Sequence, residues 1–358
     1  MYRNTKNVPY SVFGRGSLAQ LGDLLKPRRE AVDGPVVYFV DHFFRDHELI
    51  GRLPMEKGDQ LHFVDSSSEP EVTRIDAFKE AVSAADSRTP CCVVGIGGGN
   101  ALDTAKAVAN LLTNPGKAED YQGWELVKNP AVYKIGIPTL SGTGSECSRT
   151  CVLTNIPKNL KLGMNSDYTV YDQLLLDPDL LATVPRDQYF YTGIDTFMHC
   201  VESLQGSYRN AIIDAFSVRA VQLCEEIFLS DDMMSEENRE KMMIASYIGG
   251  MAAGNVGVIH PFSAGLGVVL HVAHGLGNCL ALNVLGDIYP KEYKQFRTMI
   301  ERQGVNLPTG ICKDLTEEQY EGLYRGCIVH EKPLTNALGP DFKQILTREN
   351  LIERYKSI

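Results

Sequence analysis

The sequence lacks three features that would each assign a protein to a narrow class. No stretch approaches the roughly 20 consecutive apolar residues of a membrane-spanning helix, no basic run exceeds a few residues, and none of the nine cysteines forms a Cys-x-x-Cys pair. Because nucleic acids and anionic membrane surfaces select clustered Lys and Arg, the missing basic runs argue against both as main partners. The cysteine pattern indicates neither a disulfide framework nor a zinc ribbon.

The charge balance and the first residues agree with this picture. Thirty-five basic and 45 acidic residues give a formal net charge of −10. Residues 1–5 contain no apolar segment of the kind found at the centre of a signal peptide. We therefore expect a cytoplasmic protein that acts on a small molecule and binds neither nucleic acid nor a membrane.

Length and composition indicate two globular domains. The chain has 358 residues, about twice the usual domain length. Hydrophobic residues make up 44% of it and charged residues 22%, which are values of globular proteins.

The two halves differ in their expected secondary structure. The first half alternates β-branched runs with helical stretches, as in a parallel sheet flanked by helices. After Asp177 amphipathic helical segments dominate. The sequence therefore predicts an α/β domain over residues 1–177 and an all-helical domain over residues 178–358. Strands are expected at 36–40, 91–96 and 133–137, and helices at 74–85, 100–112, 188–204, 211–228 and 236–253.

A glycine-rich segment joins the second expected strand to a helix that Asn100 would cap. Backbone without side chains can approach a diphosphate, and the free N–H groups of a helix N-terminus stabilise it. The segment does not match GxGxxG, because Asn100 stands at the third glycine position. A tight turn also needs glycine, but four glycines in positions 95–99 exceed that need. We expect Gly97, Gly98, Gly99, Asn100 and, one turn later, Asp103 to contact a nucleotide.

Two further segments suit a nucleotide. Asp41 ends the first expected strand, where a carboxylate could bind an adenosine ribose and would repel a 2′-phosphate, which favours NAD over NADP. An ordinary polar cap of a strand is the equal alternative. The loop 138–146 is dense in hydroxyls and glycine, although such loops also occur as plain turns. Its candidate cofactor contacts are Thr139, Leu140, Ser141, Thr143 and Ser145.

Candidate metal ligands lie in the second half. Asp195 and His199 are four residues apart in an expected helix, so both side chains leave one face about 6 Å apart at Cβ. Such a pair alone is more often an ion pair than a metal site. The balance changes because His260, His271 and His274 fall within fifteen residues of each other.

A shared ion requires a break in the chain between His260 and His274. Fourteen residues of straight helix would rise about 21 Å, far beyond the ~3 to 4 Å between ligand atoms of one metal. Gly265 and Gly267, or the residues just before His274, could provide the break, and we expect irregular chain at the glycines 275 and 277. Three imidazoles and a carboxylate suit Zn²⁺ or Fe²⁺ better than Mg²⁺ or Ca²⁺. The sequence does not choose between zinc and iron.

Taken together, these segments resemble the iron-containing, or group III, alcohol dehydrogenase family, whose relatives include dehydroquinate synthase and glycerol dehydrogenases. The match runs nearly end to end, and its combination of segments is specific although each segment alone is weak. It covers 13–18, 97–100 with Asp103 and 105–106, 138–146, 177–178, 193–195 with His199 and Glu202, and finally His260 and 274–275.

The resemblance implies a fold, cofactors and an assembly. The implied fold is a Rossmann-like α/β domain followed by a helical domain, with the active site in the cleft and a homodimer as the usual assembly. The glycine loop would hold the pyrophosphate of NAD, residues 139–143 would touch the cofactor, and Asp41 would select NAD. A divalent metal, Fe²⁺ or Zn²⁺, would be held by Asp195, His199, His260 and His274.

Within the family, the chain resembles bacterial enzymes that oxidise the C8 hydroxyl of the sugar acid 3-deoxy-α-D-manno-octulosonate to an aldehyde, a step toward an 8-amino sugar of lipopolysaccharide. Lys161 and Arg149 are candidates for binding the carboxylate of this substrate, with Lys161 taken as a catalytic candidate. Surface charges without such a role are the alternative for both. Spacing and composition alone name no substrate.

One position departs from the family pattern. Most members carry a histidine four residues after the position of His260, in a proton relay, and Ala264 stands there instead. We expect His271 to substitute as a catalytic residue, with water and ribose hydroxyls as the alternative route for the proton. The departure also leaves open whether oxygen is the final electron acceptor.

Two other functions share the same features. A lyase of the dehydroquinate synthase kind would return the hydride within one turnover, but we see no cluster of Lys and Arg for a phosphate-bearing substrate. A catalytically inactive nucleotide-binding subunit would explain Ala264, but it would not need four metal ligands.

Overall fold

The computed structural model describes residues 6–158 and 160–358. Its contacts divide the chain into two compact units: unit 1 is Met1–Leu140 with Ser145–Thr183, and unit 2 is Ser141–Gly144 with Val184–Ile358. The domain boundary expected after Asp177 stays a prediction. Among the described residues no single helix is long and apolar enough to cross a membrane, while one pair bent by 91°, Glu236–Asn255 with Ile259–Leu270, passes that test by length and composition.

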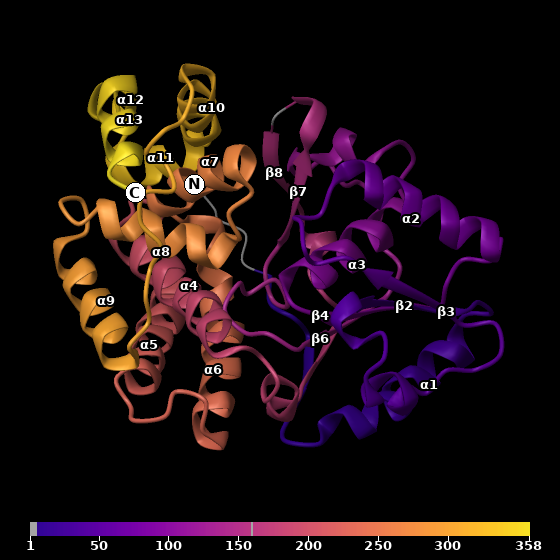
Figure 1. Cartoon of the computed structure of the whole chain (residues 1–358). Coiled ribbons are helices and arrows are strands. Elements are labelled where there is room, and N and C mark those ends of the chain that lie inside the picture. Colours follow the sequence, from indigo (N-terminus) through magenta and orange to yellow (C-terminus); the bar gives the residue numbers. More distant parts are fainter. Residues whose placement is uncertain (1–5, 159) are drawn as a thin grey trace. The chain divides into compact units, whose positions relative to one another are not determined.

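Unit 1 is built on a six-stranded sheet, drawn in indigo and magenta in Figure 1. The strand order is β1-β9-β6-β4-β2-β3, and every pair of neighbours is parallel. Parallel neighbours place their C-terminal ends at one edge, so Asp41 of β2 and Gly97 of β4 end side by side. The strands are β1 (Tyr10–Phe13), β2 (Val36–Asp41), β3 (Gln60–Val64), β4 (Cys92–Gly97), β6 (Lys134–Pro138) and β9 (Gln173–Leu176).

Helices cover both faces of this sheet, because its buried strands are apolar on both sides. Alternate residues of β2 point to opposite faces: Val36 and Tyr38 pack with α1, whereas Val37 and Phe39 pack with α2 and α3. The predicted α/β domain with a parallel sheet is therefore confirmed. Its helices are α1 (Leu21–Ala31), α2 (Val72–Ala85) and α3 (Gly99–Leu111), with 3-10 helices at Ser17–Gln20, His42–Phe44, Glu48–Arg52, Ala118–Tyr121, Ile156–Lys158, Asp167–Thr169 and Pro178–Leu181.

A second, three-stranded sheet of unit 1 was not predicted. It has the order β5-β8-β7, with β7 and β8 antiparallel. In β7, fully buried residues alternate with half-buried ones, and threonine stands at two of the three half-buried positions, so the sequence shows no continuous hydrophobic run. The strands are β5 (Gly123–Trp124), β7 (Thr150–Asn155) and β8 (Leu160–Asn165).

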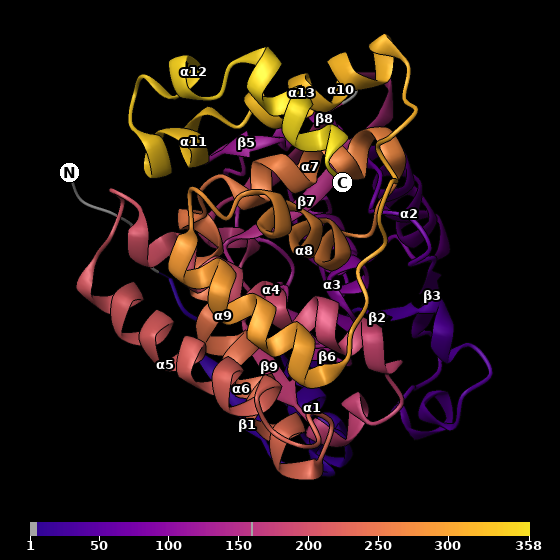
Figure 2. The same cartoon turned by 60° about the vertical axis from the view of Figure 1, so that its left-hand side comes forward.

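In its described residues, unit 2 contains helices and no strands, which confirms the predicted helical half. Helices α10 to α13 gather at one end of this unit in Figure 2. Helices α7 and α10 cross closely: a Cβ on Gly326 would lie 2.9 Å from the Cα of Gly265. The helices are α4 (Arg186–Gln205), α5 (Ala211–Phe228), α6 (Glu236–Gly249), α7 (Ile259–Leu270), α8 (His274–Val284), α9 (Pro290–Gln303), α10 (Glu317–Ile328), α11 (Glu331–Leu338), α12 (Phe342–Ile345) and α13 (Arg348–Lys356), with a 3-10 helix at Gly250–Asn255.

Three local predictions were wrong. The N-cap of α3 is Gly98 rather than Asn100, which lies inside the first turn. The helix expected to run to residue 253 ends at Gly249 and continues as a 3-10 helix. Gly275 and Gly277 lie within regular α8, where a Cβ would come within 2.5 Å of a backbone oxygen and 2.6 Å of a serine hydroxyl. These two glycines therefore serve close packing, not irregular chain.

Candidate metal centre

Helix α4 carries Asp195, His199 and Glu202 on one face, because residues four and seven apart along a helix lie on the same side. Asp195 is fully buried, and His199 and Glu202 are 4% and 1% exposed. A neighbouring glycine keeps the surroundings tight: a Cβ on Gly193 would lie 2.7 Å from the ring of Phe228. The carboxylates are therefore held away from solvent on a rigid helix.

The helix break that the histidines require lies just before His274. Helix α7 begins at Ile259, so His260 stands in its first turn, and it ends at Leu270. His271 follows in the left-handed conformation (φ 55°) as the C-cap, and α8 begins at His274. The second of the two expected break points is thus the observed one, and both ligand candidates stand at helix starts.

The four predicted ligands converge in unit 2. One ligand atom from each of Asp195, His199, His260 and His274 lies within 4.8 Å of the others. We call these residues the four-residue cluster. Asp195 Oδ1 is 3.1 Å from His260 Nε2 and 3.7 Å from His199 Nε2, and its Oδ2 is 3.5 Å from His274 Nε2.

These separations fit one metal ion. Four ligands at about 2.1 Å from a tetrahedral ion stand roughly 3.4 Å apart, which is close to the 3.1 and 3.7 Å measured from Oδ1 of Asp195 and the 3.5 Å measured from its Oδ2. Asp195 Oδ2 and His199 Nδ1 are buried with no hydrogen-bond partner among the described residues. A buried carboxylate surrounded by imidazoles therefore has the donor types, the spacing and the spare acceptor that a divalent ion needs.

The pKa values follow from burial and from the mutual contacts. Burial alone would raise the pKa of Asp195, but the facing histidines outweigh it and hold the pKa below its usual range. Burial lowers the pKa of His199 to about 3. Burial would also lower the pKa of His260, but Glu202 and Asp195 raise it to about 9. Of these two imidazoles, only His260 must therefore release a proton near neutral pH to bind a metal.

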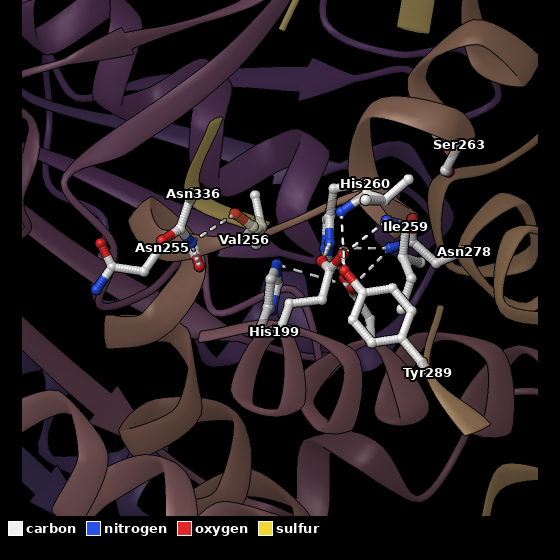
Figure 3. A network of polar contacts seen from close by, with 12 residues as sticks. His199, Asn255, Val256, Ile259, His260, Ser263, Asn278, Tyr289 and Asn336 are labelled. Carbon is white, nitrogen blue, oxygen red and sulfur yellow. Dashed lines mark hydrogen bonds and ion pairs between the residues drawn. The ribbon is translucent and has the colours of Figure 1, made fainter. Parts of the chain in front are cut away.

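Glu202 fixes both the ring and the helix of His260. Its Oε2 lies 2.5 Å from His260 Nδ1, and its Oε1 accepts hydrogen bonds from Ile259 N at 2.6 Å and Tyr289 Oη at 3.1 Å. Figure 3 shows Ile259, His260 and Tyr289 around this network. Since an ionised carboxylate only accepts hydrogen bonds, the proton of neutral His260 lies on Nδ1, and the Nε2 lone pair faces the cluster.

Two residues of this centre were missed from the sequence. Tyr289 accepts a hydrogen bond from Val258 N at 3.0 Å while donating to Glu202, and it lies outside the helices, where no periodicity marks it. Asn278 Nδ2 donates to Asp195 Oδ1 at 2.7 Å. Its position four residues after His274 places it on the same helix face, and this spacing is the signal that could have indicated it.

The predicted glycine loop lies at the C-terminal edge of the main sheet in unit 1. Gly97 has φ 152°, and a Cβ there would lie 2.7 Å from Ala101 Cβ and 2.9 Å from Asp41 Cβ. Gly98 caps α3, and Gly99 and Asn100 lie in its first turn. The N–H groups of this turn have no partner within the helix, and they lie where the loop ends. A side chain at Gly97 would collide with Ala101 and Asp41, so only glycine lets the loop pack this closely. The loop leads directly into the start of α3, where free backbone N–H groups can bind a diphosphate.

Asp41 has partners within the protein. Its Oδ1 accepts hydrogen bonds from Phe43 N at 3.0 Å and from Ser66 Oγ at 2.9 Å. The cap alternative therefore describes part of what this side chain does. Its role toward a ribose stays a prediction.

A buried ion pair anchors the hydroxyl-rich loop. Lys106 is fully buried, and its Nζ donates to Ser145 O at 2.8 Å and lies 3.7 Å from Asp103 Oδ1. Asp103 also accepts hydrogen bonds from Ser145 Oγ and, at 2.9 Å, from Val152 N. The described contacts of Asp103 therefore support the loop from below.

The remaining loop candidates divide between the two units. Thr139 N donates to Gly97 O at 3.0 Å, and Leu140 packs beneath Gly98 in unit 1. Ser141 and Thr143 belong to the segment Ser141–Gly144 that groups with unit 2. There Gly142 N donates to Ser246 Oγ at 2.8 Å, and Ser141 Oγ is buried without a hydrogen-bond partner among the described residues.

The two catalytic candidates lie outside the four-residue cluster. His271 is exposed at the end of α7. Lys161, in β8 of unit 1, is 7% exposed and forms an ion pair with Glu69 at 2.9 Å. Arg149 pairs with Asp167 and Glu125, each at 2.5 Å. Both cations thus have carboxylate partners within the protein, and their roles toward a substrate stay predictions.

Two family models cover most of the chain. "Iron-containing alcohol dehydrogenase" matches residues 9–178, and "Fe-containing alcohol dehydrogenase family, C-terminal" matches residues 189–322. The sulfoacetaldehyde reductase of Bilophila wadsworthia is 34% identical over 220 residues, which is 60% of this chain and only 56% of that protein. The NAD-dependent methanol dehydrogenase of Bacillus methanolicus is 30% identical over 278 residues, 75% of this chain and 71% of that protein.

Solved structures show the same fold. The sulfoacetaldehyde reductase of Bifidobacterium kashiwanohense in complex with NAD⁺ has a TM-score of 0.80 at 24% identity, covering 99% of this chain and 98% of that one. An alcohol dehydrogenase from Oenococcus oeni has a TM-score of 0.83 at 20% identity, covering 99% of each chain. The chain therefore belongs to the iron-containing alcohol dehydrogenase family, whose members use a divalent metal and NAD.

Proposed function

We propose that this protein is a metal-dependent oxidoreductase that transfers a hydride between a hydroxyl-bearing carbon of a small molecule and NAD. The observation that carries the proposal is the convergence of one carboxylate and three imidazoles within 4.8 Å, from three helices and from positions up to 79 residues apart. Family membership supports the same reaction class, because the named relatives include alcohol dehydrogenases and an aldehyde reductase.

The residues of the four-residue cluster would hold the metal, which is Fe²⁺ or Zn²⁺ by the chemistry of the donors. A bound divalent ion would supply Lewis acidity that lowers the pKa of a substrate hydroxyl. The chain contributes the geometry: α4 fixes the carboxylate, and Glu202 fixes the proton of His260 on Nδ1. The low exposure of Asp195 and His199 keeps bulk water away from the donor atoms.

The glycine loop and Asp41 would bind the dinucleotide. The backbone of the glycine loop and the N–H groups at the start of α3 would bind the diphosphate, with no side chain standing between them. A ribose 2′-hydroxyl can donate to Asp41, whereas a 2′-phosphate would be repelled, so we expect NAD rather than NADP. Residues 139–145 would line the same cofactor, with Asp103 supporting them from below.

Proton transfer needs an acceptor other than the residue at position 264. Ala264, 7% exposed, carries no group that could accept a proton. We propose His271 as the acceptor, with water and the ribose hydroxyls as the other route, and Lys161 as a group that meets the substrate carboxylate. His271 stands in the three-residue link that precedes His274, which is why it is preferred.

For the substrate, we propose the terminal C8 hydroxyl of 3-deoxy-D-manno-octulosonate, oxidised to an aldehyde in the synthesis of an 8-amino sugar of lipopolysaccharide. The end-to-end sequence resemblance supports this assignment. We also propose a homodimer located in the cytoplasm.

The test uses the purified full chain, loaded separately with Fe²⁺ and Zn²⁺, with NAD and the eight-carbon sugar acid. We expect net NADH formation, metal bound at one ion per chain, and loss of both in Asp195→Ala and His274→Ala. Activity and metal content unchanged in both variants would refute the site. NADH formed from simple alcohols but not from the sugar acid would refute the substrate alone. Turnover without net NADH would favour a lyase, and formation of peroxide would identify oxygen as the acceptor.

A further inference from the structure

Asn278 occupies a central position beside the four-residue cluster. It lies one turn after His274 on α8 and is fully buried. Its Nδ2 donates to Asp195 Oδ1 at 2.7 Å and lies 3.3 Å from both His260 Nε2 and His274 Nε2 (Figure 3). One amide nitrogen therefore stands next to three of the four proposed ligands.

The orientation of this amide follows from its partner. An ionised carboxylate accepts hydrogen bonds and donates none, so the NH₂ group of Asn278, rather than its oxygen, must face Asp195. This contact falls on Oδ1 of Asp195, which also lies 3.1 Å from His260 Nε2. The other carboxylate oxygen, Oδ2, is buried and has no hydrogen-bond partner among the described residues. In the metal-free chain, Oδ1 of Asp195 therefore accepts a hydrogen bond from Asn278, whereas Oδ2 accepts none from the described residues.

Stability alone does not explain an asparagine at this position. Its own Oδ1 is buried without a hydrogen-bond partner in the described part of the chain, and a buried unpaired amide oxygen costs free energy. A leucine of similar size would fill the same space without that cost. The hydrogen bond that Asn278 donates to Asp195 is the interaction that offsets this cost.

We propose that Asn278 is a positioning residue that determines how Asp195 meets the metal. By holding Oδ1 in a hydrogen bond, it leaves Oδ2 as the oxygen that is directed to the ion, and it keeps Asp195 from binding through both oxygens together. Ligating carboxylates are commonly held by such outer contacts. Single-oxygen binding keeps a coordination position open for a hydroxyl, as catalytic sites require. The inference rests on the metal site proposed above.

The test compares Asn278→Leu and Asn278→Ala with the matched variant Asn110→Leu in the full chain. Asn110, on α3 of unit 1, is equally buried, donates to Thr169 Oγ1 at 2.9 Å, and also has an amide oxygen without a partner in the described residues. Asn278→Ala only removes atoms, so it provides a folded variant should the leucine fit poorly. Each protein is loaded with Co²⁺, whose visible absorption is intense at four ligands and weak at six. Affinity is measured by competition with a chromophoric chelator.

We expect both Asn278 variants to bind Co²⁺ about 10 to 100-fold more weakly than the parent chain and to show weaker visible bands, because both carboxylate oxygens can then bind. Asn110→Leu should lower thermal stability and leave affinity and spectrum unchanged. Parent-like affinity and spectrum in both Asn278 variants would overturn this inference while leaving the proposed function standing. Failure of the parent chain to bind Co²⁺, or equal binding by Asp195→Ala, would overturn both.

Discussion

The sharpest prediction concerns Glu202, which contacts the proposed metal ligand His260 through its Nδ1. In Glu202→Gln the side chain keeps its size, but only one of its two terminal atoms can still accept hydrogen bonds. The native carboxylate accepts from His260 Nδ1 at one oxygen and from Ile259 N and Tyr289 Oη at the other. Whichever way the amide turns, its NH₂ group faces a donor that the carboxylate had satisfied.

The magnitude follows from that loss. A hydrogen bond to a charged group contributes roughly 1.5 to 3 kcal/mol, which for a domain of this size lowers the melting temperature by on the order of 3 to 12 °C. Removing an outer partner of a metal-binding histidine costs about 10 to 100-fold in metal affinity. We therefore expect both a lower melting temperature in chelator and weaker metal binding in Glu202→Gln.

The assay is calorimetry of the chain with and without metal, together with chelator competition. Glu301→Gln, an exposed position on α9, is the control and should match the parent in both measurements. Parent-like metal affinity in Glu202→Gln, at any melting temperature, would refute the argument that this carboxylate orients His260. A drop in melting temperature alone would reduce Glu202 to a structural cap of α7.

Three further predictions follow from single positions. Gly97→Ala should weaken NAD binding at least about tenfold and lower the free energy of unfolding by roughly 1 to 3 kcal/mol, because the φ of 152° and the 2.7 Å approach of a Cβ both oppose a side chain. Calorimetric titration with NAD measures the change in affinity. The control Gly51→Ala, where a Cβ would meet no neighbouring atom, should bind NAD as the parent does. Metal affinity should rise with pH up to about 9, because the ion must displace the proton of His260. In the metal-free chain the raised pKa of His260 stabilises the fold fully below about pH 6.5 and progressively less as the pH rises through about 9. Chelator-treated protein should therefore melt at a lower temperature at pH 9.5 than at pH 6. His260→Gln, which lacks this titrating group, should not show that decrease. Gly265→Ala should destabilise unit 2 by several kcal/mol, because its Cβ would come within 2.7 Å of a backbone oxygen of α10; Gly254→Ala, with nothing nearby, should melt within a degree or two of the parent.

The sequence predicted the parts of the fold that carry strong periodicity. The apolar runs of β2 and β4 and the amphipathic pattern of α5 are long enough to outweigh local noise, and α5 was predicted at its observed bounds, Ala211–Phe228. The strands β1 and β9 were missed because each has only four residues. Such strands are defined by their neighbours in the sheet rather than by their own composition.

In the candidate site, too, the sequence predicted contacts between residues close along the chain better than contacts between residues far apart. The pair Asp195 and His199 followed from helical spacing. The need for one ion to reach both late histidines required a break between them, but it left two places open, one of them just before His274. Tyr289 could not be predicted in this way, because its contact with Glu202 joins residues 87 positions apart. Hydrogen bonds of that kind depend on how helices pack, which the order of residue types along the chain does not specify.

The glycines show where the sequence was misleading. Gly275 and Gly277 suggested irregular chain, yet both lie in α8, where neighbouring atoms leave no room for a Cβ. A glycine required by close packing and one required by a positive φ look alike in a sequence. Only the structure separates them: Gly97 has a positive φ, and these two do not.

The central claim is that one carboxylate and three imidazoles hold a single divalent ion. X-ray absorption at the metal edge of the purified, metal-loaded chain tests it most directly. We predict one ion per chain with nitrogen and oxygen neighbours at about 2.0 to 2.2 Å, and loss of that signal in His274→Ala. A shell of sulfur neighbours at about 2.3 Å, or a metal content far below one per chain, would contradict it.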